Sequence, residues 1–147
     1  MLPLSDAQER YVRLHAIRPH TSVCNMTVAF DVHGVWNIDC WHEAWEILSA
    51  RHPLLRAGVE QTMSGSLRFR LCESVAKCVD VLDAVSAVEE WKEYVNNVAE
   101  DSHFDEMIVT RAPMWRARAI PNGSTRFGLA VALTDAVPVI VRTSSSR

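Results

Sequence analysis

The sequence predicts a mixed α/β (α+β) sandwich, with helices packed on a sheet. Two segments, residues 25–33 and 127–134, alternate large apolar residues with small or polar ones, a period typical of strands. Two other segments repeat apolar residues every three or four positions, as amphipathic helices do, and a third segment begins with a helix-capping pattern. These elements follow one another as helix, strand, helix, strands, helix and strands. A chain of 147 residues, 48% of them hydrophobic, can form one core or part of a larger one.

The first helix begins at a capping box, in which Ser5 is the N-cap and Gln8 the third helical residue. Helix formers continue to about Leu14, and Pro19 blocks a longer helix.

The second helix is capped by Asn37 or Asp39 and ends before Pro53, with Trp36 placed to staple its first turn. The third helix follows a short apolar segment at residues 79–82. The apolar stripes expected to face the core are Ile38, Trp41, Trp45 and Leu48 in the second helix, and Val85, Val88, Trp91, Val95 and Val98 in the third.

Among the strands, residues 25–33 should have one buried face and end at Gly34. Residues 56–60 and 67–71 read as short strands around a loop at residues 63–66. Residues 115–120 form a further strand before a turn, Pro121-Asn-Gly-Ser124. The last strand, residues 127–134, has small residues on its second face, which indicates that both of its faces are covered: Gly128, Ala130, Ala132.

The net charge of −3 and the pI near 6.0 disfavour general electrostatic binding to nucleic acid or to anionic lipid. No apolar run approaches the roughly 18–20 residues of a membrane helix, and no secretory signal begins the chain. We therefore expect a cytoplasmic protein with reduced thiols rather than a disulfide or a metal site: Cys24, Cys40, Cys72, Cys78.

Charge is unevenly distributed, because residues 73–110 carry ten acids and two bases. The simpler interpretation is a solvated acidic helix, and the alternative is a docking face for a partner.

Two further side-chain groups could suggest chemistry. Asp39, His42 and Glu46 share a helical row, for which surface salt bridges are favoured over a metal site. His103 and Asp105 would point to the same face if their segment were extended, but no nucleophile is placed beside them.

Three segments together resemble nonribosomal peptide synthetase condensation domains. The start resembles their first motif, S-x-A-Q-x-R, and residues 51–56 resemble their second, R-H-x-x-L-R. Phe104-Asp105 followed by Ala112-Pro-Met-Trp-Arg-Ala117 resembles their F-D-x(n)-P-L-x-R-A segment. The motif residues expected to have structural roles are Ser5, Gln8, Arg10, Arg51, His52 and Arg56.

This resemblance implies one N-terminal lobe of a chloramphenicol acetyltransferase-like fold, whose two lobes enclose a tunnel. It implies a family that forms amide or ester bonds by acyl transfer from a phosphopantetheine thioester, on a carrier protein or coenzyme A, to an amine or alcohol. Polyketide-associated and wax-ester-type acyltransferases share the architecture and stay open as alternatives.

The sequence departs from the family at its catalytic motif, H-H-x-x-x-D-G. The equivalent positions begin at Thr134 and Asp135, and Val139 stands where the motif has its Asp. A carboxylate with an ordinary pKa near ~3.9 is a poor general base at neutral pH, so Asp135 does not replace the second His. No residue of this chain is therefore expected to be catalytic.

From this resemblance we expect a condensation-like lobe over residues 1–137 and an atypical tail over residues 138–147. The chain should be a truncated relative, inactive alone, with no cofactor or metal bound directly. Its expected partners are an acyl or peptidyl carrier protein or a C-terminal condensation lobe, and the alternative function is a carrier- or partner-binding module. Surface left open by a missing lobe should promote self-association.

Overall fold

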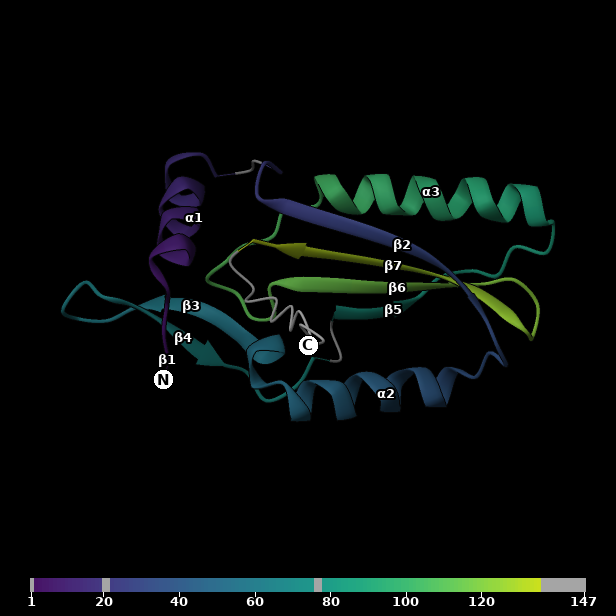
Figure 1. Cartoon of the computed structure of the whole chain (residues 1–147), viewed down its shortest axis with the longest axis horizontal. Helices are drawn as coiled ribbons and strands as arrows, with labels where there is room; N and C mark the ends of the chain where they lie inside the picture. Colours follow the sequence, from purple (N-terminus) through teal and green to yellow (C-terminus); the bar gives the residue numbers. More distant parts are fainter. Residues whose placement is uncertain (1, 20–21, 76–77, 136–147) are drawn as a thin grey trace, which may run out of the picture.

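The computed structural model describes residues 2–19, 22–75 and 78–135. The predicted tail, residues 138–147, lies outside the described residues, as does His20. Two sheets and three α-helices form the described chain (Figure 1). The mixed α/β class and the three helices are as predicted, whereas the division of the strands into two sheets was not predicted. No helix in this part of the chain is long and apolar enough to span a membrane.

The larger sheet has the strand order β2-β7-β6-β5. The long strands β2 (Asn25–His33) and β7 (Arg126–Thr134) pair antiparallel over nine residues. On the other side of β7, β6 (Trp115–Pro121) pairs antiparallel with it and parallel with the short β5 (Val79–Val81).

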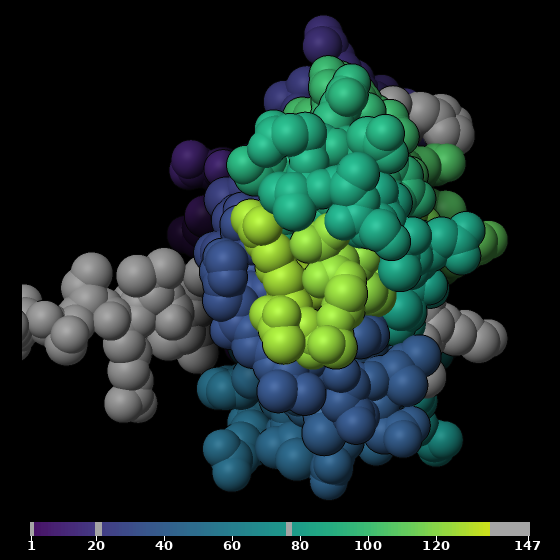
Figure 2. All heavy atoms as spheres, turned by 90° about the vertical axis from the view of Figure 1, so that its right-hand side faces the viewer, coloured from purple at the N-terminus to yellow at the C-terminus, as the bar shows by residue number. Residues whose placement is uncertain are grey.

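Two helices lie on opposite faces of this sheet. Helix α3 (Val88–Phe104) packs on β7 and β2, and α2 (Ile38–Arg51) runs along the other face (Figure 1). Figure 2 shows this layering end-on, with the β6–β7 turn between α3 above and the start of α2 below. On the α3 side, small residues of β7 let the helix approach closely, since a Cβ at Gly128 would lie 2.4 Å from Val95 Cγ2.

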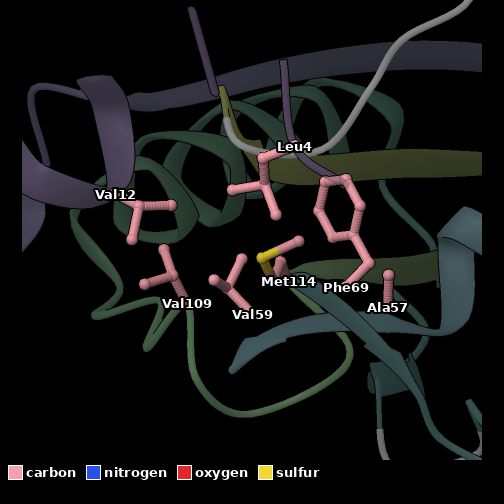
Figure 3. Close-up of a cluster of buried hydrophobic side chains, with 7 residues drawn as sticks. All are labelled: Leu4, Val12, Ala57, Val59, Phe69, Val109 and Met114. Atoms are coloured by element: carbon pink, nitrogen blue, oxygen red, sulfur yellow. The ribbon is translucent and has the colours of Figure 1, made fainter. Parts of the chain in front are cut away.

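The smaller sheet has the order β1-β4-β3, with β1 (Leu2–Pro3), β3 (Ala57–Gln61) and β4 (Leu67–Leu71). A 3-10 helix, η1 (Pro53–Arg56), leads from α2 into β3. Helix α1 (Asp6–Ile17) and the segment before β6 cover this sheet. Figure 3 shows the cluster that joins them: Leu4, Val12, Ala57, Val59, Phe69, Val109, Met114.

Several local predictions are confirmed. Both hydrogen bonds of the Ser5–Gln8 capping box are present. Asn37 rather than Asp39 caps α2, through hydrogen bonds to its side chain from two backbone N–H groups. Trp36 staples that helix, because its ring lies 5.9 Å from Trp41 between centroids.

Other boundaries were wrong. Helix α1 continues to Ile17, one turn past the predicted end. Val85 precedes α3, where its N–H donates to Pro121 O, but it packs against the same core cluster as Trp91. Val88, the first residue of the helix, is 40% exposed rather than buried. Strand β1 was not predicted, because two residues carry no periodicity.

The largest correction concerns β2, whose apolar face was expected to be buried. Met26, Val28 and Phe30 are 43%, 38% and 50% exposed. Across the same sheet face the alternating residues of β7 are partly buried, and Ala117 and Ala119 of β6 are fully buried beneath α2. Helix α2 therefore covers the β6 side of this face and leaves the β2 side open; we call Met26, Val28 and Phe30 the open β2 face.

The α2 stripe is likewise only partly buried. Trp41 is buried and Trp45 half-buried, whereas Ile38 and Leu48 are 49% and 39% exposed. The helical period places these residues correctly on one side of α2. The helix covers only part of the sheet face, however, so not all of them are buried.

The close approach of β3 to the segment before β6 provides a stability test. A Cβ on Gly58 would lie 2.8 Å from the backbone N of Ala112, which cannot move aside as a flexible side chain can. We expect Gly58→Ala to lower the free energy of unfolding by about 1–3 kcal/mol, the cost typical of overpacking. Urea denaturation followed by circular dichroism measures this change.

Gly34→Ala is the matched control, because a Cβ there meets nothing within 4 Å. It should change the free energy of unfolding by less than about 1 kcal/mol. Equal effects of the two substitutions would contradict the packing of β3 against Ala112.

Candidate functional site

The end of β7 is the candidate site, since the family resemblance places the catalytic motif there. Two backbone hydrogen bonds fix it: Thr134 N donates to Met114 O at 3.2 Å, and Asp135 N donates to Cys24 O at 2.8 Å. Thr134 is buried, and Asp135 is half-buried. The chain thus leaves the sheet at a defined position between the start of β2 and the start of β6.

Asn25 ties the neighbouring strand to the end of α3. Its Nδ2 donates to His103 O and to Asp105 O, each at 2.9 Å, and the residue is only 7% exposed. The start of β2, the end of β7 and the C-terminus of α3 therefore meet in one corner of the sandwich.

Asp105 forms the ionic contacts of this corner, with two arginines of β6. Arg118 of β6 donates from Nη2 to Asp105 Oδ2 at 2.8 Å and from Nη1 to Ser102 Oγ at 2.6 Å. A second guanidinium, that of Arg116, lies 3.6 Å from the same carboxylate oxygen. The Arg118 side chain is 17% exposed, so this contact is better shielded from solvent than a surface pair.

The segment of His103 and Asp105 is not extended, so the condition under which their side chains would share one face is not met. His103 lies in the last turn of α3, and Asp105 is the residue that ends the helix. The Asp105 carboxylate faces two arginines instead, so the F-D and R-A parts of the third motif meet as a structural contact.

The residues of the first two motifs lie elsewhere. Ser5 and Gln8 close the α1 cap, and Arg10 is exposed on that helix. Arg51 and His52 are exposed at the end of α2. Arg56 bridges elements, since it donates to Ser49 O at 3.3 Å and to Cys72 O at 3.1 Å.

The thiols offer no nucleophile in this corner. All four cysteines are unpaired. Cys78 borders an open hollow of about 220 Å³ beside Arg111 and Arg116, but burial raises the pKa of its thiol to about 11. Burial and the nearby Asp135 carboxylate also raise the pKa of Cys24. Thiols with raised pKa values are poor nucleophiles near neutral pH.

Within residues 2–19, 22–75 and 78–135, no three histidine, cysteine or carboxylate side chains gather as metal ligands would. His42, which the sequence places in a row with Asp39 and Glu46, is exposed on α2.

Residues 1–133 match the condensation domain family. The chain belongs to this family. The match ends within β7, one residue before Thr134. No curated protein matches the chain significantly.

Solved condensation domains have the same fold. The starter condensation domain of rhizomide synthetase RzmA is 14% identical with a TM-score of 0.79, over 92% of this chain and 34% of that one. The first condensation domain of the CDA synthetase is 12% identical with a TM-score of 0.78, over 90% and 35%.

A variant of the rhizomide synthetase domain, solved in complex with C8-CoA, is 15% identical with a TM-score of 0.78, over 92% and 31%. At such identities the likeness shows the fold alone. This chain spans 31% to 35% of the length of these three neighbours, so the fold is a partial lobe of theirs.

Sequence reasoning missed the partners of Asp105. Arg116 and Arg118 alternate with buried alanines of β6 and therefore share the sheet face on which α3 packs. This two-residue alternation could have indicated from the sequence that the two arginines lie on one face of β6. Nothing in the sequence indicated that Ser102 and Asn25 would join them.

The Asp105–Arg118 contact can be measured by a double-mutant cycle. We expect Arg118→Met and Asp105→Asn, made singly and together, to show a coupling energy of about 1–3 kcal/mol in urea unfolding, as partners in one network do. The exposed pair Glu89–Lys92 on α3, 3.1 Å apart, is the control. Its cycle of Glu89→Gln and Lys92→Met should give less than about 0.5 kcal/mol. Equal coupling in the two cycles would refute the special role of Arg118.

Proposed function

We propose that this chain is the first-lobe scaffold of a condensation-type acyltransferase and that it does not catalyse acyl transfer alone. The observation that carries the proposal is the end of β7. Two backbone hydrogen bonds hold that end, and the residues there, where the resemblance leads us to expect the catalytic histidines, are Thr134 and Asp135.

The substrate class that fits this proposal is an acyl thioester of phosphopantetheine, carried by coenzyme A or a carrier protein. The variant solved with C8-CoA supports a thioester, because its fold is similar to this one. In the reaction an amine or alcohol attacks the thioester carbonyl, a C–N or C–O bond forms, and the C–S bond breaks. The acceptor's proton goes to a base and then to the departing thiolate.

In this proposal the base comes from a second polypeptide segment that bears H-H-x-x-x-D-G and a second lobe. The described residues would instead hold the surrounding backbone in place. The carbonyls of Met114 and Cys24 accept hydrogen bonds from the end of β7, and Asp105 ties the end of α3 to β6. An acyl or peptidyl carrier protein would present the donor to the joined lobes.

The proposal predicts no acyl transfer by the purified chain. Incubated with octanoyl-coenzyme A and a panel of amines, it should form amide no faster than buffer, because no base lies at the end of β7. Mass spectrometry of the products measures this. Asp135→His adds an imidazole at the end of β7 and should also be inactive, because the chain still lacks the second lobe that would enclose the substrate.

The second part of the test is to sequence the coding DNA beyond the codon for Arg147 and to translate it in all three frames. If a frame encodes H-H-x-x-x-D-G and a second lobe, the joined polypeptide should transfer the acyl group. Turnover by the chain alone, or a folded joined polypeptide without turnover, would contradict the proposal.

A further inference from the structure

Strand β2 has an unpaired edge in the described structure. It is the outer strand of the order β2-β7-β6-β5, and its only partner there is β7. It is also long, with nine residues in continuous register, whereas the opposite edge strand, β5, has three. A long edge strand presents a row of unpaired backbone N–H and C=O groups, which is a template for another strand.

The side chains of β2 suit pairing with a strand of similar pattern. The open β2 face exposes Met26, Val28 and Phe30, while Thr27 on the α3 face is half-buried. The strand's carboxylate, Asp31, is already occupied, because Arg126 donates two hydrogen bonds to it. An occupant should therefore be an edge strand with apolar residues on one face and no acid opposite Asp31.

We propose that a second copy of this chain pairs antiparallel with β2 about a two-fold axis through Ala29. Such a contact is isologous, so each copy supplies the same strand, and the two sheets become one of eight strands. The pairing is independent of the function proposed above, since it uses a backbone edge and not the end of β7.

The register of this pairing follows from the sequence of β2. With Ala29 opposite its own copy, all nine residues find a partner. Val28 then faces Phe30 of the second copy and Met26 faces Val32, so apolar residues meet on one face. On the other face Thr27 is opposite Asp31, and Asn25 is opposite His33.

Shifted registers are less favourable. An axis through Asp31 would place two carboxylates opposite one another, which destabilises a strand pair. Axes through Val28 or Phe30 avoid this clash, but they leave part of the nine-residue strand unpaired.

Helix α3 opposes the pairing electrostatically. Helix α3 packs partly on β2 and carries five acidic residues and one lysine. In the paired dimer the two α3 helices would lie near one another across the axis, and their negative charges would repel. Salt screens this repulsion, because the Debye length is about 10 Å at 0.1 M ionic strength and shorter at higher salt. The association should therefore strengthen as the ionic strength is raised.

Cysteine cross-linking tests the register. In a Cys40→Ser background, which removes an exposed thiol, we expect Ala29→Cys to form a disulfide-linked dimer on mild oxidation at 0.3 M NaCl. Directly opposed residues of antiparallel strands lie within the Cα separation that a disulfide spans. Val32→Cys is the control, because in this register it faces position 26 rather than its own copy. Equal cross-linking at the two positions, or none at position 29, would overturn the proposal.

Sedimentation equilibrium tests the surface without a new thiol. The unmodified chain should show a concentration-dependent dimer, and Phe30→Lys should weaken its association at least tenfold. Met63→Lys, in the fully exposed β3–β4 loop, should leave the association unchanged. A monomer at all concentrations, or a dimer insensitive to Phe30→Lys, would show that β2 does not carry the contact.

Discussion

The indole of Trp115 connects the larger sheet to the segment that leads into the smaller one. Its Nε1 donates to Leu55 O at 2.6 Å, and its ring stacks on Trp45 with centroids 4.8 Å apart. Leu55 lies in η1, which leads into the smaller sheet, whereas Trp115 begins β6 of the larger one. Trp115 is 2% exposed and Leu55 is half-buried, so this hydrogen bond lies largely away from water and is costly to lose.

The candidate site depends on the same junction. Met114, the residue before Trp115, packs in the cluster of the smaller sheet while its carbonyl accepts from Thr134 at the end of β7. Adjacent residues of one chain segment thus bind the smaller sheet, the helix α2 layer and the end of β7. The end of β7, where the family resemblance leads us to expect the catalytic motif, is therefore held in place by packing and by these hydrogen bonds.

The sequence predicted the elements better than their surroundings. Alternation located β7 and β2, and the cap at Ser5 and that at Asn37 or Asp39 located two helix starts, because these signals are local. The same alternation in Met26, Val28 and Phe30 could not distinguish a covered face from an open one, since strand periodicity records which residues share a face and not what lies over it. The Asp105–Arg118 contact joins two elements, so it too required the fold.

Hydrogen exchange of a Trp115→Phe variant is the most direct test of this account. Phenylalanine keeps an aromatic ring but cannot donate to Leu55 O. We expect amides of β3 and β4 to lose at least about tenfold more protection than amides of α3, which packs on the opposite sheet face, because the smaller sheet would open separately. An equal loss in both regions, or no loss in β3 and β4, would contradict the claim that Trp115 holds the two sheets together.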